Sequence, residues 1–428
     1  MLSILTKKYP LVRRRLISTL WRSYHATNSI NDSNRKLKGY EFYEKVLGSP
    51  KYILAPMVEQ SELAWRLLCR RYGVQLCYTP MFHARLFTDP GCGEKYRFEQ
   101  WSTSLMDRPL IVQFCANDVD HFLKAAKMVE NQCDAIDLNL GCPQAIAKKG
   151  HYGSYLQDDW DLINKLISTA DKELNIPITA KIRVFKDVSK TIDYAKMIIK
   201  SGAQLLTVHG RCREQKGHHT GLADWSIIKA VRDAIPDTPI IANGNILYHE
   251  DIQRCLDATG ADGVMSAEGA LFNPAIFQKE RNMPPLAYEI ALEYLNICKS
   301  VQPTTRAEVV RAHLFRLLHA SLKQNENLRP LLDGCNSLDM MEQIVCELKI
   351  RMERERLQCT ELPVKGDIHQ IRDYAPWRCQ PRFRPKLSVD HEELRNKERR
   401  QKALAALAAL KAEREHLDVN KSRQAARP

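Results

Sequence analysis

From about residue 50 the chain alternates short apolar runs with longer amphipathic stretches. Each run has the length of a strand, and most are rich in Ile, Val and Leu without strict alternation of apolar and polar positions. Strands that are buried on both faces have this pattern, which predicts a parallel sheet with helical crossovers. The predicted strands are Tyr52–Ala55, Gln75–Thr79, Leu110–Phe114, Ala135–Leu140, Ile178–Ile182, Gln204–Val208, Pro239–Ala242 and Asp262–Ser266.

Helices are predicted between these runs, and glycines stand where three helices should end: Gly73, Gly202 and Gly260. The predicted helices include Trp65–Tyr72, Val119–Asn131, Trp160–Asp171, Ser189–Ser201 and Ile227–Ala234. Eight strand–helix units in residues 50–285 predict an α/β fold, a (β/α)8 TIM barrel. A doubly wound open sheet is the competing architecture. The absence of GxGxxG after the first strand weighs against a dinucleotide-binding sheet of that kind.

The strand pattern stops after about residue 285. Residues 286–360 are expected to form a second, helical domain, because Arg306–Lys323 and Asp339–Glu355 have helical periodicity. Residues 361–428 combine an irregular segment rich in Pro and Arg with a basic tail, whose composition favours a solvated helix ending in disorder. Residues 1–45 are assigned to a basic N-terminal extension.

The formal net charge is +13, which favours a polyanionic partner such as nucleic acid or an anionic membrane surface. No apolar run approaches the roughly 20 residues that span a bilayer, so integral membrane association is not expected. The 13 cysteines include no CxxC pair. A zinc or iron–sulfur site of familiar spacing is therefore not expected, and a reducing compartment fits better than a disulfide scaffold.

Residues 1–31 contain six Lys and Arg residues but no Asp or Glu, and Ser and Thr are interspersed among them. This composition is typical of a mitochondrial transit peptide. The alternative is a basic N-terminal tail on a cytoplasmic or nuclear protein.

Chemically capable residues follow the predicted strands in order. In a TIM barrel, functional side chains gather at the carboxyl ends of the strands. Each residue alone is more often structural than functional, but the ordered series indicates a site. The series comprises Pro56, Met57, Val58, Gln113, Asn139, Cys142, Lys181, Arg183, His209, Arg211, Asn243, Gly244, Asn245, Ala267 and Glu268.

The motifs in this series resemble those of the tRNA-dihydrouridine synthase family over about residues 50–285. They are Ala-Pro-Met from residue 55, Asp-Leu-Asn-Leu-Gly-Cys-Pro from 137, Lys-Ile-Arg from 181, Thr-Val-His-Gly-Arg from 207 and Ile-Ala-Asn-Gly from 241. Pro-Met-Phe-His from 80 and Gly-His-His from 217 look most like the eukaryotic branch that acts on D-loop uridines 16 and 17. The resemblance implies FMN as cofactor, NADPH or NADH as reductant and tRNA as substrate.

The resemblance also implies roles. Cys142 matches the general acid that protonates C5 of uracil while a flavin supplies hydride to C6, and a thiol with a reference pKa of about 8.5 is protonated at neutral pH. Lys181 matches the lysine that faces the flavin N1–O2 edge. The implied cofactor-binding residues are Pro56, Met57, Val58, Gln113, Lys181, His209, Asn243, Gly244, Asn245, Ala267 and Glu268, and the implied substrate-binding residues are Asn139, Arg183 and Arg211.

One position departs from the family pattern. Many bacterial relatives have Gly-Arg where this chain has Ala267-Glu268. A carboxylate does not attract phosphate, so we expect this position to act through backbone N–H groups with the Glu268 side chain turned away.

Two alternatives remain at this stage. One is a small-molecule flavin dehydrogenase that reduces pyrimidines, and the other is a non-catalytic RNA-binding barrel. The basic charge disfavours the first, and the complete set of Gln113, Cys142, Lys181 and His209 disfavours the second. We expect residues 286–360 and the basic tail to contact tRNA through phosphate neutralisation, and the chain to act as a monomer.

Overall fold

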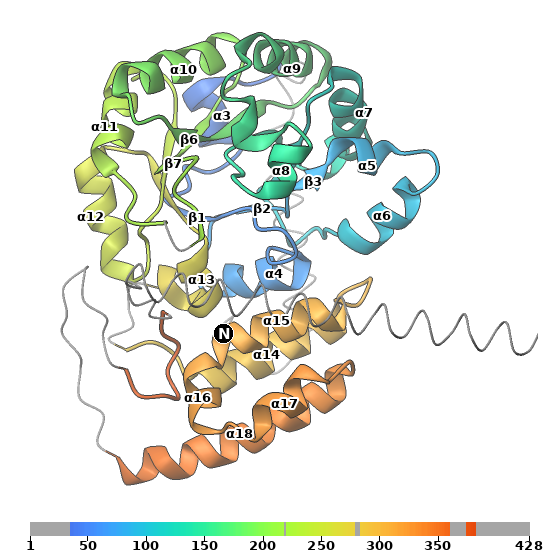
Figure 1. Ribbon diagram of the computed structural model, residues 1–428, viewed down its shortest axis with the longest axis vertical. Coiled ribbons are helices and arrows are strands. Elements are labelled where there is room, and N and C mark those ends of the chain that lie inside the picture. Colours follow the sequence, from blue (N-terminus) through green and yellow to red (C-terminus); the bar gives the residue numbers. More distant parts are fainter. Residues whose placement is uncertain (1–34, 218–219, 279–282, 360–373, 382–428) are drawn as a thin grey trace, which may run out of the picture. The chain divides into compact units, whose positions relative to one another are not determined.

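The computed structural model describes residues 35–217, 220–278, 283–359 and 374–381 (Figure 1). Eight parallel strands form a closed barrel, because β2 pairs with both β1 and β4. The prediction of a TIM barrel is confirmed, since a doubly wound sheet would leave two open edges. The strands are β1 (Tyr52–Leu54), β2 (Leu76–Tyr78), β4 (Leu110–Cys115), β5 (Ala135–Leu140), β6 (Ile178–Val184), β7 (Leu206–Cys212), β8 (Ile240–Asn243) and β9 (Gly263–Ser266), with β3 (Phe82–His83) added beside β4.

An outer ring of helices surrounds the strands. Four of these helices begin at an Asp whose side chain accepts a backbone N–H of the first turn, namely Asp118, Asp159, Asp187 and Asp224. Such caps satisfy donors that have no partner within the helix. The ring helices are α4 (Leu63–Arg71), α7 (Val119–Val129), α9 (Trp160–Glu173), α10 (Val188–Lys200), α11 (Trp225–Ala234) and α12 (His249–Thr259).

Shorter helices lie in the loops. The sequence did not predict β3 or the helices α5 (Ala84–Thr88) and α6 (Gly93–Gln100), all of which lie between β2 and β4. In α6 only Gly93 is buried, so this helix has no apolar face that a periodicity could reveal. The remaining short elements are η1 (Glu130–Gln132), α8 (Ala145–Lys149), η2 (Gly153–Leu156), α13 (Glu268–Phe272) and η4 (Pro274–Phe277).

Helix α3 (Gly39–Lys45) covers the amino ends of the strands. Phe42 and Tyr43 pack in one apolar cluster with residues of the barrel interior such as Ile53, Leu76 and Met265. The Tyr43 hydroxyl donates to the Pro50 carbonyl at 2.8 Å. Part of the segment that the sequence assigned to an N-terminal extension therefore belongs to the barrel core. A targeting sequence removed by cleavage would have to end before this helix.

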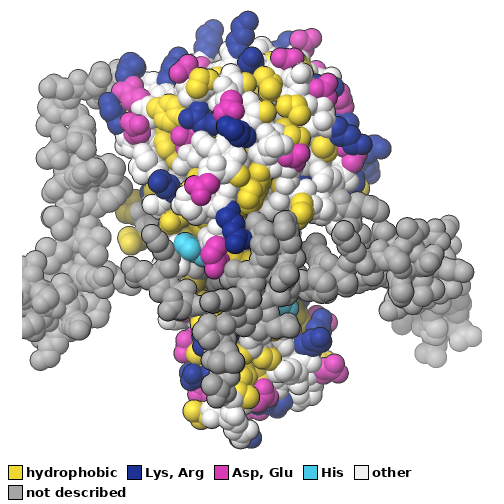
Figure 2. All heavy atoms as spheres, turned by 90° about the vertical axis from the view of Figure 1, so that its left-hand side faces the viewer, with side chains coloured by type: hydrophobic (Ala, Val, Ile, Leu, Met, Phe, Trp, Pro, Cys, Tyr) yellow, Lys and Arg dark blue, Asp and Glu magenta, His cyan; other side chains and the backbone are white. Residues whose placement is uncertain are grey.

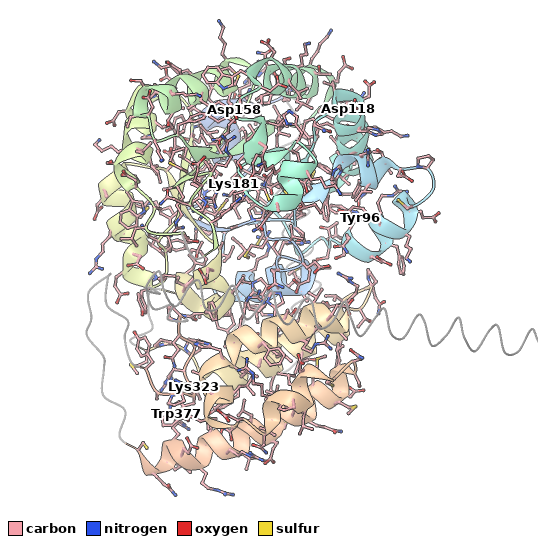
Figure 3. All side chains as sticks on the ribbon, in the orientation of Figure 1. Tyr96, Asp118, Asp158, Lys181, Lys323 and Trp377 are labelled. Atoms are coloured by element: carbon pink, nitrogen blue, oxygen red, sulfur yellow. The ribbon has the colours of Figure 1, made fainter. Side chains whose placement is uncertain are left out.

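Only helices follow the barrel within the described residues up to 359. They are α14 (Ala287–Ser300), α15 (Ala307–Leu317), α16 (His319–Gln324), α17 (Leu328–Asp333) and α18 (Leu338–Gln358). The predicted long helix is confirmed as α18, whereas the predicted stretch Arg306–Lys323 is interrupted at Leu318. Residues 374–381 pack beside the start of α14, where the Ala287 N–H donates to the Trp377 carbonyl at 2.7 Å and the Trp377 side chain is buried (Figure 3).

A partly buried polar contact joins the barrel helix α4 to α14 and α15. The Tyr294 hydroxyl donates to Glu62 Oε1 at 2.6 Å, and His313 Nε2 lies 3.0 Å from Glu62 Oε2. The Trp65 ring stacks on the His313 ring, with centroids 3.9 Å apart. We call these four residues the Glu62 contact. Because Glu62 also caps α4 through the Trp65 N–H, one carboxylate serves both the barrel and the helices after it.

Candidate active site

Polar side chains fill the barrel interior near the carboxyl ends of the strands. Alternate residues of a strand share one face, so Asp137 and Asn139 both point into the barrel. In the parallel register Asp137 pairs with Gln113 and with Thr179, and Asn139 pairs with Lys181. Toward the amino ends the interior is apolar, lined by Ile53, Leu76, Ile111, Ala135, Ile241 and Met265. The interior therefore becomes polar only where a TIM barrel places its site.

A chain of hydrogen bonds runs from the interior to the backbone of Cys142. Gln113 Nε2 donates to Asp137 Oδ2 at 2.7 Å, and Asn139 Nδ2 donates to Gln113 Oε1 at 2.8 Å. Asn139 Oδ1 accepts the N–H groups of Gly141 and Cys142, at 3.2 and 2.9 Å. These bonds fix both amide orientations, so the loop that carries Cys142 is positioned by side chains from β4 and β5.

Asp137 anchors this chain of hydrogen bonds. Its side chain is fully buried, and its other oxygen accepts from the Thr179 hydroxyl at 2.6 Å. Burial raises the pKa of Asp137 to about 6, although the bonds from Thr179 and Gln113 act in the opposite direction. The sequence motif contains Asp137, but only the strand register reveals which residues it holds.

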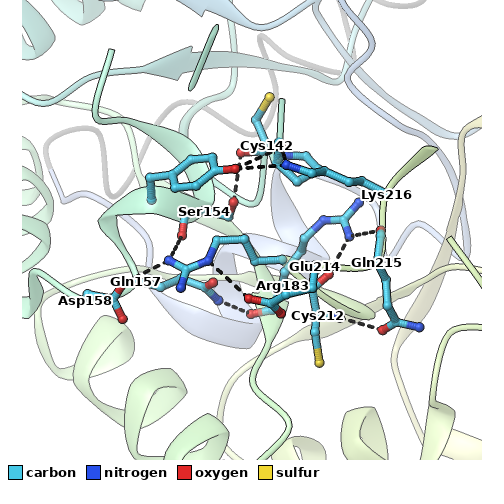
Figure 4. Close-up of polar contacts among 12 residues, drawn as sticks. Cys142, Ser154, Gln157, Asp158, Arg183, Cys212, Glu214, Gln215 and Lys216 are labelled. Carbon is cyan, nitrogen blue, oxygen red and sulfur yellow. Dashed lines mark hydrogen bonds and ion pairs between the residues drawn. The ribbon is translucent and has the colours of Figure 1, made fainter. Parts of the chain in front are cut away.

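Cys142 is half-buried on a tight loop after β5. Burial raises the pKa of its thiol, so the side chain is protonated at neutral pH and can donate a proton. The loop is closely packed, since a Cβ on Gly153 would lie 2.8 Å from the Cys142 carbonyl oxygen. The Ser154 hydroxyl donates to the same oxygen at 2.9 Å (Figure 4).

Lys181 lies inside the barrel with 9% of its surface exposed (Figure 3). Its ammonium donates to Asn243 Oδ1 at 2.9 Å, and no ion pair with a carboxylate is found among the described residues. Burial and the neighbouring Arg183 lower the pKa of Lys181 to about 8. A buried ammonium with only an amide partner is expected to attract an anionic ligand.

Residues after β7 and β8 form a close-packed corner. Arg211 donates to His209 Nε2 at 3.0 Å and to Asn245 Oδ1 at 2.9 Å. Burial lowers the pKa of His209 well below its usual value, so the ring is neutral and accepts this bond. Gly244 has φ +116°, and a Cβ there would lie 2.6 Å from the Ala223 side chain. The positive φ and the close packing of this corner therefore require glycine at position 244.

Arg183 is 8% exposed, and its side chain donates to backbone carbonyls alone among the residues that the structure describes. One of its terminal nitrogens donates to the carbonyls of Cys212 and Gln215, at 2.8 and 2.9 Å (Figure 4). Its Nε is buried without a hydrogen-bond partner. Burial and Arg211 lower the pKa of Arg183 to about 10, which leaves the guanidinium charged at neutral pH.

The remaining predicted residues line the edge of this region. Pro56 and Met57 are partly buried after β1, whereas the Val58 side chain is 56% exposed. Ala267 precedes α13, and Glu268 is the exposed first residue of that helix.

No group of three or more His, Cys, Asp or Glu side chains within the described ranges could hold a metal ion. In the same ranges, every helix is too short or too polar to cross a membrane.

The closed barrel, with a half-buried thiol and a buried ammonium at the carboxyl ends of its strands, defines an enzyme of the TIM-barrel class. Residues 53–354 match the family model described as dihydrouridine synthase. The chain belongs to the dihydrouridine synthase family.

Several relatives cover most of this chain, among them the following three. The tRNA-dihydrouridine(16/17) synthase of Saccharomyces cerevisiae is 47% identical over 84% of this chain and 90% of its own length. The enzyme of the same name from Schizosaccharomyces pombe is 47% identical over 82% and 92%. A mouse protein named as similar to this enzyme is 48% identical over 82% of this chain and 72% of its own length. All three names include NAD(P)(+).

Proposed function

We propose that the protein reduces uridine at positions 16 and 17 of the tRNA D-loop to 5,6-dihydrouridine. The names and coverage of the relatives support this reaction. The observation that carries it in the structure is the fixed position of Cys142, whose backbone N–H is held by Asn139 at 2.9 Å. The reaction adds a hydride at C6 of uracil and a proton at C5, and NADPH or NADH supplies the reducing equivalents.

The residues at the site fit FMN as the cofactor. Lys181, which pairs with no carboxylate among the described residues, would supply an ammonium to the pyrimidine edge of the isoalloxazine, and Gln113 retains a second N–H beyond the one that binds Asp137. Gly244 and Asn245 follow β8, the seventh strand of the barrel, and TIM barrels commonly bind phosphate at the loops after the seventh and eighth strands, so these residues are proposed to hold the phosphate. Pro56, Met57, Val58, His209, Asn243, Ala267 and Glu268 complete the proposed cofactor site. When bound and reduced, FMN supplies the hydride.

Cys142 delivers the proton in this proposal. Its raised pKa keeps the thiol protonated at neutral pH, and the Asn139 side chain prevents the loop from moving away. The resulting thiolate lies near Arg183 and Lys181, both of which stabilise its negative charge. The thiol then regains a proton from solvent. Asn139, Arg183 and Arg211 are proposed to contact the nucleotide.

The tRNA needs contacts beyond the uridine, because turning a base out of its stack costs a few kcal/mol. Basic side chains of the helices after the barrel could supply these contacts, but some of them are already engaged within the protein. Arg306 is paired with Glu59 at 2.8 Å, and Arg311 donates to the Cys335 carbonyl at 2.7 Å, so both stabilise the fold. Lys323 is exposed and available. On the face shown in Figure 2, basic and acidic side chains are interspersed on the barrel.

The basic tail and the N-terminus enter the proposal from the sequence. From 378 to 428 there are 14 Lys and Arg against 7 Asp and Glu, an excess of 14 − 7 = +7, and we propose that this tail contacts tRNA phosphates. Its residues from 382 onward lie outside the described residues, as do residues 1–31. We propose that residues 1–31 direct the protein to mitochondria.

The test compares Cys142→Ala with Cys346→Ala, a matched control at an exposed cysteine of α18. Both variants should bind flavin and accept electrons from NADPH. In single turnover with tRNA, Cys142→Ala should form little dihydrouridine and Cys346→Ala should match wild type. Equal product from both variants would reject Cys142 as the acid. Reduction of free pyrimidines but not tRNA would favour the dehydrogenase alternative, and a protein without flavin or turnover would favour the RNA-binding barrel.

A further inference from the structure

Three cationic side chains gather around the loop after β5: Arg183 and Lys216 (Figure 4), and Arg213, whose guanidinium donates to the Ser154 carbonyl at 3.2 Å. The cluster also contains two carboxylates, Asp158 and Glu214. Both bind Arg213, at 2.8 and 3.5 Å. Among the described residues, Arg183 and Lys216 therefore contact only neutral groups.

Lys216 is exposed but held in place. Its ammonium lies 3.1 Å from the Pro143 carbonyl oxygen and 3.2 Å from the Tyr155 hydroxyl. The Tyr155 hydroxyl donates to the same Pro143 carbonyl at 3.3 Å. An ammonium has three N–H donors, so one remains for another acceptor. The lysine is thus held at the residue that follows Cys142, and no carboxylate pairs with it among the residues that the structure describes.

Arg213 and Lys216 both lie near the aromatic ring of Tyr155. The guanidinium carbon of Arg213 is 5.4 Å and the ammonium of Lys216 is 5.9 Å from the ring centroid. An aromatic ring attracts either cation, but two cations at one ring repel each other. An anion bound at Lys216 would offset this repulsion.

Arg183 provides an independent indication of an anionic ligand. It lies beside the other end of the same loop, where its Cγ would be 3.6 Å from a Cβ placed on Gly141. Its Nε is buried without a partner, and an unpaired buried donor is costly. Cationic side chains thus lie beside both chain neighbours of Cys142, Arg183 beside Gly141 and Lys216 beside Pro143.

We propose that Lys216 binds a phosphate of the RNA backbone next to the uridine at Cys142, and that Tyr155 positions the lysine for this contact. The inference rests on the proposed reduction of uridine in tRNA. A phosphodiester accompanies every nucleotide, and phosphate contacts position nucleic acids on proteins. Binding this phosphate would help to hold a uridine that has left its stack. NADPH also carries phosphates, so the experiment separates the two sources.

The experiment measures KM for tRNA over a series of salt concentrations with the full-length, flavin-loaded protein. Lys216→Gln should raise KM about tenfold and reduce the slope of log KM against log salt by about 0.7–0.9. Lys216→Arg should retain the wild-type slope. Tyr155→Phe should raise KM less and leave the slope unchanged, because the charge remains. Lys200→Gln is the matched control, since this exposed lysine ends α10 at the opposite end of the barrel.

Flavin reduction by NADPH, followed without tRNA, should be the same in Lys216→Gln and wild type. A higher KM for NADPH with unchanged tRNA binding would assign the phosphate to NADPH and overturn the proposal. A wild-type KM and salt slope in Lys216→Gln would also overturn the proposal. A lower kcat with unchanged KM would overturn it too, because it would show that Lys216 only stabilises the loop. A wild-type protein that reduces no tRNA uridine would refute the proposed function instead.

Discussion

Replacing Asn139 with Ala should release the Cys142 loop from the barrel interior. The Asn139 side chain makes three hydrogen bonds, to the N–H groups of Gly141 and Cys142 and to Gln113 Oε1. Each such bond contributes about 1 kcal/mol net. Two of the three hold the loop, so losing them weakens the observed loop arrangement by about 2 kcal/mol, which is about thirtyfold in the ratio of loop arrangements. We therefore expect proton delivery to slow by about 10- to 100-fold.

Asn139→Asp separates the bonds that Asn139 accepts from the loop from the bond that it donates to Gln113. A carboxylate still accepts the N–H groups of Gly141 and Cys142, but it places an oxygen against Gln113 Oε1 in place of a donor. The loop should therefore stay in position while the link to Gln113 is lost. Asn139→Asp should retain more activity than Asn139→Ala if loop position is what matters.

Two assays read the outcome. Single-turnover dihydrouridine formation from pre-reduced enzyme measures proton delivery, and the rate of Cys142 alkylation, followed by mass spectrometry of its peptide, measures loop position without RNA. Flavin content and NADPH oxidation serve as folding controls. If Asn139→Ala forms product and is alkylated at wild-type rates, the hydrogen bonds to Asn139 do not position Cys142.

Four further predictions follow from the site and the termini. The pKa of Lys181 is about 8, so its charge is present below that pH and is lost above it. The affinity of the flavin-free protein for FMN should therefore fall as pH rises through 8. Lys181→Met should bind FMN weakly at every pH, and a pH-independent affinity in wild type would contradict this role. Gly153→Ala adds a Cβ 2.8 Å from the Cys142 carbonyl at φ +63°, so calorimetry should show a lower Tm and product should form more slowly; an unchanged Tm would contradict the close packing. Residues 1–31 fused to a fluorescent reporter should reach mitochondria, whereas a diffuse signal would leave only a basic tail. Deleting residues 387–428 should raise KM for tRNA and flatten its salt dependence with flavin reduction intact, and an unchanged salt slope would exclude the tail from the RNA-binding surface.

The strands were predictable because parallel strands buried on both faces leave continuous apolar runs. All six residues of β4 and of β5 are buried, and both strands lie where the runs predicted them. Elements without an apolar periodicity were missed. Helix α6 buries only Gly93, and α3 covers the barrel with few residues inside a segment that reads as a basic extension.

The sequence predicted which residues form the candidate site, but it did not predict the hydrogen bonds among them. Strand order places Gln113, Asn139 and Lys181 at one end of the barrel. Their partners depend on register and side-chain rotamers, so the bond from Gln113 to Asp137 was not foreseen. Lys216 carried no sequence pattern of its own, because an exposed lysine in a polar loop is ordinary. Only the structure shows that its ammonium binds the Pro143 carbonyl, next to Cys142 in the chain.

The Glu62 contact sets a rule for building chimaeras within this family. Glu62 belongs to the barrel by sequence, yet its carboxylate binds Tyr294 and His313 from the helices after it. Exchanging those helices for a segment that lacks the tyrosine and the histidine would leave the partly buried carboxylate without these partners. In such an exchange the Glu62–Trp65 turn has to be moved together with the helices, so the junction of the chimaera lies inside the barrel sequence and not at its end.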